Sequence, residues 1–591
     1  MRSPINLIPY SLNESNLVTN LQIYWIRCTM NSFIRKTRRF SLAKKEIPQI
    51  VPVTEPEYSL LTEPWLKVVT KNGEVKNYGL YGLFENLDNV SSLLVDVEME
   101  DPAIFRMLLA IMYRALDPVL VDDWKTWWSE GSLPVDRILD YLKEHEDRFW
   151  LFHPEHPFMQ TMIEPKEGSS GALRGTGSLI PEPIGINVLS NRTDHSADHL
   201  GMDELVRRLI TAVQYDRSAA HASYKGALDD RKGITYATRA YLGQMSAVRL
   251  KTGSLKKDLL LALIPLDSGL FVFPESDSWD DDEDDELTAG IPLWETDGLQ
   301  LDGSGTPNDP PTSSTIEEAL TWPSRRVRLF KMSNGMISVL IAAGKHSTLK
   351  NAQGIEPMAS FRETQDKKDS PVYLIPWMAS PDKAFWRSFT ALVASNGKVP
   401  PMTLRWAARL QDADLLSKNY VGSVSVITTR YDSSMSSKVT ACLSDGVSLP
   451  LSILESPTDS QKIEDAISIA EDMIYAYRNL VAGESIAEGH EVESARSAAA
   501  VHTASAYDKL GEAFYSWVVE LPDLGDEAMK KWIDISEDAV RKLARKKLDN
   551  APKRAIMGRT VDSTVYATPV IEARFNGALK KIRSNALGEE R

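Results

Sequence analysis

The sequence has very little cysteine, since Cys28 and Cys442 are the only two among 591 residues. Two cysteines so far apart exclude a disulfide framework and a zinc site built on thiolates. No apolar run approaches the roughly 18 residues that span a bilayer. The first residues also lack the apolar run and small-residue cleavage site of a secretory leader. We therefore expect a cytoplasmic protein without a membrane segment.

Signatures of common catalytic sites are absent too. The segment around Gly344 and Lys345 lacks both the upstream glycine and the Ser or Thr directly after lysine that a phosphate-binding loop requires. There is no G-x-S-x-G nucleophile elbow, and neither cysteine lies in a catalytic signature. The sequence therefore predicts a protein that is not an enzyme and that needs no cofactor.

Negative charge predominates, with a net charge of −15 that disfavours nonspecific DNA binding over the whole surface. The charge is unevenly distributed, because residues 280–286 are all acidic. The segment from Arg541 to Arg591 has 13 Lys or Arg against 5 Asp or Glu, a local net charge of +8. Such a basic patch can contact phosphate locally, although charge runs are more often only solvated faces.

Turn and helix signals mark the body of the chain. Asn72-Gly73 lies between two extended runs and predicts a β-hairpin. Asp101-Pro102 is typical of a helix N-cap followed by proline at the first helical position. A tryptophan cluster at helical spacing follows, and it favours core packing over base stacking: Trp124, Trp127 and Trp128.

Near residue 456 the pattern changes to amphipathic helices joined by short connections. Four stretches carry apolar residues at steps of three and four: Ile463–Tyr477, Tyr507–Trp517, Met529–Leu543 and Ile571–Ile582. We expect helix breaks between them at Gly483, Pro522 and Pro552. Four such helices predict a four-helix bundle.

The sequence as a whole predicts an α+β protein in three parts. Residues 1–55 form an N-terminal extension: a disordered tail, a basic tail that binds nucleic acid and an upstream start are the alternatives. Residues 56–455 form a large mixed α/β domain with a mobile acidic insertion at about 275–315. Residues 456–591 form the all-α four-helix bundle.

The stretch from Leu151 to Thr161 combines prolines and aromatics with two histidines. His153, Glu155 and His156 are residue types that bind zinc, so a metal-dependent hydrolase is one alternative function. These residues lie between two prolines and not on a helix face, which differs from the HExxH arrangement. The spacing favours a rigid, hydrogen-bonded turn that binds no metal.

The same stretch contains the sequence HPFMQ from His156 to Gln160, which resembles a segment of the CasA-type large subunit of the type I-E CRISPR surveillance complex, Cascade. Further segments are similar to that family in the same order: Leu320–Leu329 (LTWPSRRVRL), Glu356–Arg362 (EPMASFR), Lys383–Arg387 (KAFWR), Ser448–Leu451 (SLPL) and Ala513–Trp517 (AFYSW). Each is only moderately specific, and their shared order makes the resemblance strong over roughly residues 58–583.

The resemblance implies a large α/β domain, a C-terminal four-helix bundle and a subunit without catalysis. It implies a place at the 5′ end of the crRNA, beside the other Cascade subunits. There the subunit would read the protospacer-adjacent motif in double-stranded DNA, help open the duplex and recruit the helicase–nuclease for antiviral defence. The protein then reads a short motif while guide RNA pairing reads the sequence. A scaffold whose bundle binds only protein is the second alternative.

The resemblance also places the elements of the motif-reading site. The family's glycine-rich loop falls at Ser218–Gly226, where Ala and Ser replace most glycines, and a lysine that enters the groove falls at Lys345 or Lys350. The wedge falls at 432–436, where Ser and Met replace the usual glutamine and Met435 offers an apolar wedge. The residues assigned to DNA binding in the two loops are Ser218, His221, Ser223, Lys225, Gly226, Ser433, Ser434, Met435 and Ser436.

Two further segments complete this set. The loop that approaches the neighbouring subunit and the crRNA end falls near 191–199, with Asn191, Arg192, His195 and His199. The basic helix near 541–547 is a guide for the displaced strand through phosphate contacts of Arg541, Lys542, Arg545 and Lys546. Three arginines on the expected strand favour structural roles: Arg325, Arg326 and Arg328.

Overall fold

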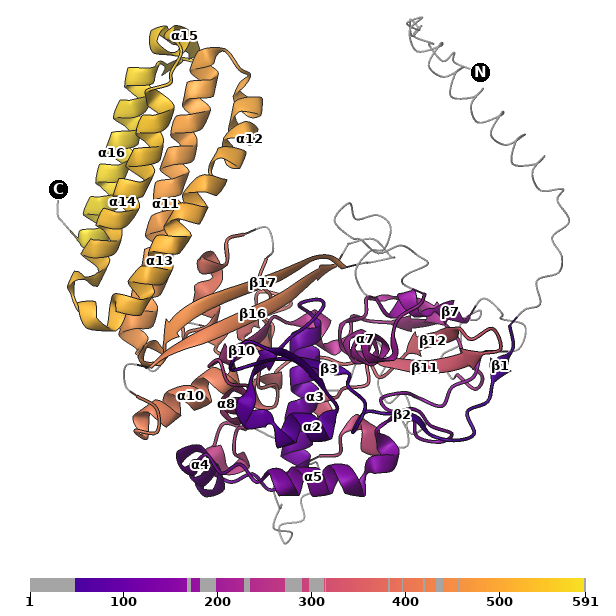
Figure 1. The fold of residues 1–591 in the computed structure, drawn as a ribbon. Helices are drawn as coiled ribbons and strands as arrows, with labels where there is room; N and C mark the ends of the chain where they lie inside the picture. The colour runs from indigo at the N-terminus through magenta and orange to yellow at the C-terminus, as the bar shows by residue number, and fades with distance from the viewer. Residues whose placement is uncertain are drawn as a thin grey trace, which may run out of the picture. The chain divides into compact units, whose positions relative to one another are not determined.

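Figure 1 shows the computed structural model of the chain. It describes residues 48–166, 172–180, 198–227, 234–271, 290–296, 313, 315–380, 383–395, 397–417, 420–431, 439–454 and 456–588. Met1–Ile50 and Val51–Arg591 are separate units. Most of the expected N-terminal extension and of the acidic insertion lies outside the described residues, so both remain predictions.

The Asn-Gly turn forms as predicted. β3 (Leu66–Thr70) and β4 (Val75–Tyr78) pair antiparallel around Gly73, whose φ of +84° lies in the left-handed region that favours glycine. The expected N-cap at Asp101 is wrong, because Met99 is the N-cap residue of α3 (Glu100–Ala115) and Asp101 lies inside the helix. The Asp101 carboxylate instead forms a buried ion pair with Arg249, 2.9 Å from its guanidinium.

The tryptophan cluster packs into the core, as predicted. Trp124 on α4 (Val121–Glu130) is fully buried, and its indole N–H donates to the carbonyl oxygen of Leu260 at 2.8 Å. Its ring stacks on that of Trp128 with centroids 5.3 Å apart. Trp127 is buried as well. Burial of Trp124 and Trp127 removes their rings from any role in stacking on bases.

Two antiparallel sheets carry the segments that matter for the candidate site (Figure 1). The long strand β16 (Val421–Tyr431) pairs with β17 (Val439–Pro450) on one side and with β10 (Ala247–Lys251) on the other. In the second sheet, β11 (Arg325–Met332) and β12 (Ile337–Ala343) form a hairpin. The hairpin turn has Gly335 at a φ of +79°.

Shorter elements complete the mixed α/β part. Among the described residues, its other α-helices are α2 Leu80–Glu85, α5 Val135–Glu144, α7 Met202–Tyr215, α8 Leu255–Ala262, α9 Ile316–Leu320 and α10 Met402–Asp412. Its other strands are β1 Ile50–Val51, β2 Glu57–Ser59, β5 Val90–Leu93, β6 Trp150–Phe152, β7 Arg174–Gly175, β8 Ala219–Ala222, β9 Ile234–Ala237, β13 Phe361–Thr364, β14 Tyr373–Pro376 and β15 Lys398–Val399.

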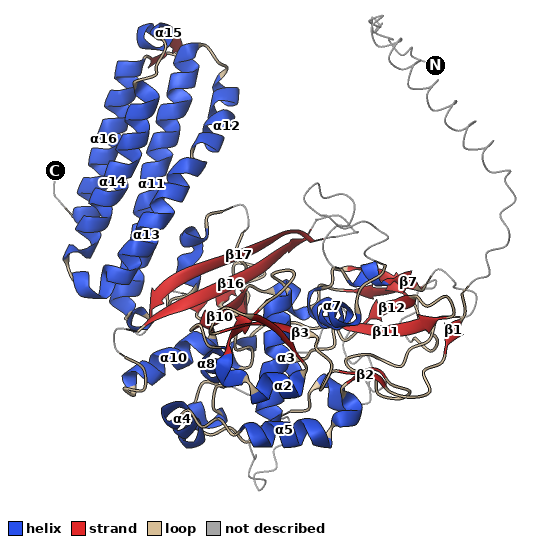
Figure 2. Cartoon of the chain, viewed as in Figure 1, coloured by secondary structure: helices blue, strands red, loops and turns tan. Residues whose placement is uncertain are grey.

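The C-terminal region is helical, as predicted, and Figure 2 shows its long helices side by side. The four long helices are α11 Pro457–Glu488, α13 Ala504–Leu524, α14 Glu527–Leu548 and α16 Thr568–Leu587. Ser456 caps α11, since its hydroxyl oxygen accepts the Asp459 N–H at 3.2 Å. The shorter elements are α12 Val492–His502, α15 Lys553–Met557 and the hairpin of β18 Arg559–Val561 with β19 Thr564–Tyr566.

Two of the three expected helix breaks are wrong. Gly483 lies inside α11, where an added Cβ would be 3.2 Å from the Ile571 side chain, so glycine here permits close packing of α11 and α16. Pro522 lies inside α13, two residues before the helix ends. Pro552 does separate α14 from α15. Tertiary packing has overridden local propensity at Gly483.

The helical region shares a hydrophobic core with part of the α/β region. One buried cluster includes Trp406 of α10, Trp386, Phe514 of α13 and Trp532 of α14. The Trp386 indole N–H donates to the carbonyl oxygen of Tyr507 at 3.0 Å, which ties the two regions together. The domain boundary expected at 455/456 remains a prediction. The two regions on either side of it share one hydrophobic core.

Candidate nucleic-acid interface

The segment Ser218–Gly226 includes β8, which pairs antiparallel with β9. The Ser218 hydroxyl donates to the carbonyl oxygen of Ala237 at 3.1 Å, and Ser223 is buried. Gly226 has a φ of +85° with open space around its Cα, so it serves a turn. Lys225 is exposed and lies 3.6 Å from Glu164, an ion pair that solvent weakens.

Asp216 organises the base of this segment. Its carboxylate accepts the Arg325 Nε–H at 2.6 Å and lies 3.2 Å from the His221 Nε2 atom. Burial would raise the pKa of Asp216, but Arg325 and His221 outweigh burial and hold this pKa well below its ordinary value. Asp216 therefore stays ionised and fixes both partners in place.

Arg325 is buried and acts as a structural residue, as predicted. Its guanidinium also donates to the carbonyl oxygens of Arg217 at 2.8 Å and Thr238 at 2.6 Å. Arg326 lies over the Tyr224 ring, and Arg328 donates to the carbonyl oxygen of Ile163 at 3.3 Å. These contacts join β11 to residues that precede β8, such as Arg217, and to Tyr224, which follows it.

Tyr431 connects the other recognition segment to the same place. It ends β16, directly before residues 432–438, and its hydroxyl donates to the carbonyl oxygen of Tyr215 at 2.6 Å. Tyr215 is adjacent to Asp216, so the chain entering the expected wedge is bonded to the chain entering β8. The expected wedge residues Ser433, Ser434, Met435 and Ser436 lie outside the described residues.

The two candidate groove lysines have different surroundings. The Lys345 Nζ atom lies 2.6 Å from a Glu318 carboxylate oxygen and 4.5 Å from the Trp322 ring centroid, so its charge is already neutralised. Lys350 is exposed, with its Nζ atom 3.9 Å from the Tyr373 ring centroid and no carboxylate partner among the described residues. This difference favours Lys350 over Lys345 for a contact with phosphate or base.

The sequence did not indicate Arg239, which lies at the same junction. It is exposed, and its guanidinium carbon is 5.1 Å from the Tyr431 ring centroid. The two residues are almost 200 positions apart, so no local pattern could have linked them. In the loop expected near the crRNA end, His199 is exposed, whereas Asn191, Arg192 and His195 lie outside the described residues.

The basic helix α14 contains two kinds of cation. Arg541 pairs with Glu537 at 2.7 Å and donates to the Asn576 side chain at 2.6 Å, and Lys542 pairs with Asp538 at 2.6 Å. Two exposed cations in the last turn of α14 have no carboxylate partner within the described part of the chain: Arg545 and Lys546. This second pair is the better candidate for contact with phosphate.

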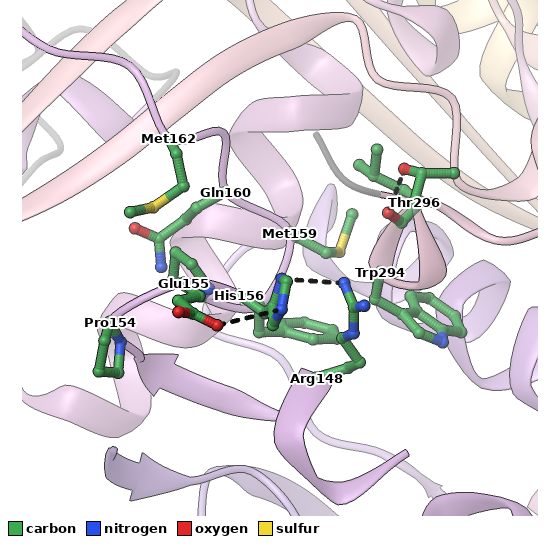
Figure 3. A pocket seen from close by; sticks show the side chains of 12 residues that line it. Arg148, Pro154, Glu155, His156, Met159, Gln160, Met162, Trp294 and Thr296 are labelled. Carbon is green, nitrogen blue, oxygen red and sulfur yellow. Dashed lines mark hydrogen bonds and ion pairs between the residues drawn. The ribbon is translucent and has the colours of Figure 1, made fainter. Parts of the chain in front are cut away.

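His153 and His156 take part in a hydrogen-bonded turn, as predicted, and Figure 3 shows the His156 ring pointing toward Arg148 and Glu155. The His153 Nδ1 atom accepts the backbone N–H groups of Glu155 at 3.2 Å and His156 at 2.8 Å. The His156 Nδ1 atom lies 3.1 Å from an Arg148 nitrogen, beside a pocket of about 360 Å³ that Met159 and Trp294 also line. Both Nδ1 atoms are thus engaged by protein groups and do not converge on a shared metal position.

Neither a metal centre nor a membrane-spanning helix is present among the described residues. Among the described residues, no three His, Cys, Asp or Glu side chains gather closely enough to hold a metal ion. Within the same part of the chain, no helix combines the length and apolar character that crossing a membrane requires.

Comparison with known proteins identifies relatives along most of the chain. The family model described as CRISPR-associated protein Cse1 matches residues 59–554. The CRISPR-associated protein CasA/Cse1 of Thermus thermophilus is 27% identical over 430 residues, which cover 72% of this chain and 77% of that relative.

Solved structures share the fold. Cse1 from Acidimicrobium ferrooxidans has a TM-score of 0.72 at 23% identity, covering 90% of this chain and 99% of the other. A chain of a CRISPR RNA-guided surveillance complex has a TM-score of 0.55 at 16% identity, covering 90% of this chain and all of the other. Because the family model matches well over half of the residues, the chain belongs to the Cse1 family of CRISPR-associated proteins, the CasA-type large subunits of Cascade.

Proposed function

We propose that this chain is the large subunit of a cytoplasmic type I-E RNA-guided surveillance complex. In that complex it recognises the protospacer-adjacent motif in double-stranded DNA, helps open the duplex for crRNA pairing and recruits the helicase–nuclease. Membership in the Cse1 family supports this proposal. The observation that carries it is the junction just before β8, where Arg325 donates to the Asp216 carboxylate and Tyr431, at the entry to the expected wedge, donates to the carbonyl oxygen of Tyr215.

The junction suits recognition by a fixed protein surface. Asp216 and Arg325 form a buried ion pair at its base, so the segments projecting from it start from defined positions. Ion pairs that are held by further hydrogen bonds and packing give geometric specificity in addition to energy. A short DNA motif can then be read by groups whose relative positions are set before binding, which lowers the entropy cost of ordering them.

Motif-selective binding by the assembled complex tests this function. The crRNA-loaded complex would be prepared with and without this chain and mixed with duplex targets that carry a library of flanking motifs. We expect tight, motif-selective binding only when the chain is present. Equal affinity and equal motif preference without it would contradict the recognition role and leave the protein-binding scaffold as the better explanation.

The duplex-opening and recruitment roles need separate measurements. A fluorescent base analogue next to the motif should report strand separation only with the complete complex. Addition of the helicase–nuclease should then degrade the target, and omission of this chain should abolish degradation. Degradation at an unchanged rate by a target-bound complex that lacks the chain would contradict the recruitment role.

The two candidate groove lysines provide a matched pair of variants. We expect Lys350→Ala to weaken target binding by about tenfold, since it removes a charge with no carboxylate partner. Lys345→Ala should weaken binding much less, because Glu318 already neutralises Lys345. Competition binding to one target duplex measures both effects. The opposite order of effects would show that Lys345 leaves Glu318 to contact DNA.

A further inference from the structure

The exposed Arg239 side chain lies beside a buried aromatic ring. Its guanidinium lies over the ring of Tyr431, and that ring is 6% exposed. The Tyr431 hydroxyl is fixed by its hydrogen bond to the carbonyl oxygen of Tyr215. Gly243 leaves room for this hydroxyl, because an added Cβ there would collide with it. The ring against which the guanidinium lies is therefore fixed in position.

The backbone at Arg239 is tied to its neighbours as well. Its carbonyl oxygen accepts an N–H of the Gln244 side chain at 3.1 Å, and the same amide group lies 3.0 Å from the Ser347 hydroxyl oxygen. The preceding residue, Thr238, accepts from Arg325 at 2.6 Å. Arg239 thus lies where β9, the segment before Lys350 and the end of β16 are bonded together.

The charges around Arg239 distinguish it from the neighbouring cations. Arg325 is paired with Asp216, Lys345 with Glu318 and Lys225 with Glu164. No carboxylate partner is recorded for the exposed Arg239 among the described residues. Stacking on an aromatic ring uses the face of a guanidinium and leaves the N–H groups along its edge available for an anion.

We propose that Arg239 binds a backbone phosphate of the target duplex at the root of the motif-reading surface. This inference rests on the proposed function and adds a DNA-binding residue to it. A planar guanidinium matches the geometry of a phosphate and can donate two parallel hydrogen bonds. Phosphate contacts position a protein on DNA without reading sequence, so Arg239 would set the register in which the neighbouring groups read the motif.

The test uses three variants of the full chain in the assembled, crRNA-loaded complex. Arg239→Ala removes the positive charge, and Arg239→Lys retains the charge but lacks the planar guanidinium group. Arg137→Ala is the matched control, because Arg137 is also exposed, lies on α5 and donates to a carbonyl oxygen and not to a carboxylate. Target affinity would be measured from low to moderate salt for a preferred and a poor flanking motif.

We expect Arg239→Ala to weaken binding by about tenfold for both motifs. The slope of log affinity against log salt should fall by about 1, the value for one lost phosphate contact. Arg239→Lys should restore the slope and part of the affinity, whereas Arg137→Ala should change neither. Equal thermal unfolding of the Arg239 variants and the parent chain would show that the fold is intact.

Three outcomes would overturn the inference. Unchanged affinity and salt slope in Arg239→Ala would exclude the contact. A change confined to motif preference would indicate base reading and not phosphate binding. Loss of crRNA from the complex before DNA is added would assign the phosphate to the guide RNA. Failure of the proposed function differs from failure of this inference. If the proposed function fails, the complex with the parent chain will itself show no motif selectivity.

Discussion

Glu317 in α9 is a buried carboxylate whose ionisation opposes folding. One of its oxygens accepts the Gly290 N–H at 2.7 Å, and the other has no hydrogen-bond partner in the described part of the chain. Burial raises its pKa from 4.5 to about 7, although the backbone N–H groups of Glu317 and Gly290 lower it in part. Between those two pH values the Glu317 carboxyl group is therefore protonated in the folded chain and ionised in the unfolded chain.

The sign of this shift sets a pH-dependent prediction for Glu317→Gln. The parent chain carries no penalty below pH 4.5, loses stability steadily as pH rises from 4.5 to about 7 and carries the full penalty above that value. The variant should match the parent at pH 4 and exceed it by about 3 kcal/mol at pH 8. Urea unfolding at both pH values measures this, and an equal difference at both would contradict it.

Arg106 and Glu356 form an ion pair that is completely buried. The guanidinium donates to both carboxylate oxygens, at 2.8 and 3.0 Å, and to the carbonyl oxygen of Ala319 at 2.7 Å. Arg106→Met should destabilise the fold by about 3–5 kcal/mol, because it leaves an uncompensated buried charge. The double variant with Glu356→Gln should recover much of this loss in chemical unfolding, and strictly additive effects would exclude the coupling.

At the scale of elements, two glycines in the helical region should respond in opposite ways. Gly483→Val would force α11 and α16 apart, because even a Cβ would lie 3.2 Å from Ile571, and we expect a loss of about 1–3 kcal/mol. Gly577 lies within α16 with open space around it, so Gly577→Ala should stabilise by about 0.5–1 kcal/mol. Thermal unfolding compares the two, and a gain in both variants would refute the packing argument.

Local signals predicted the elements that depend on local chemistry. The Asn-Gly turn before β4 and the apolar spacing of the long bundle helices needed no knowledge of distant residues. The β18–β19 hairpin was missed because its turn residues, Asp562 and Ser563, both have positive φ without a glycine. Its geometry matches the turn type that Asn-Gly usually forms, but the sequence lacks the usual signal.

The candidate site was predictable only in part. The resemblance located its segments, but the contacts that join them link residues about 100 to 200 positions apart, as Asp216–Arg325 and Tyr215–Tyr431 do. Such pairings depend on how elements pack and leave no periodic pattern in the sequence. Single lysines could not be ranked either, because the Glu318 partner of Lys345 becomes visible only in three dimensions.

Across the whole molecule, the net charge of −15 limits where the proposed DNA contacts can lie. An acidic surface repels the phosphate backbone, so productive contacts require local cations that lack carboxylate partners. The ion pairs of Arg541 and Lys542 with Glu537 and Asp538 show that part of the basic C-terminal segment is already neutralised. Counting Lys and Arg alone therefore overstates the phosphate-binding capacity of that segment.

Two double variants in α14 test whether the helical region guides DNA. Arg545→Gln with Lys546→Gln removes exposed cations without carboxylate partners, and Arg541→Gln with Lys542→Gln removes the same charge from paired positions. The first should lower the salt slope of target binding by the assembled complex by about 2, and the second by much less. Arg545 and Lys546 also stabilise the C-terminal end of the helix dipole, so thermal unfolding must accompany the measurement. Equal salt slopes in both double variants and the parent would show that the helix contacts no phosphate, and its basic face would then be only a solvated surface.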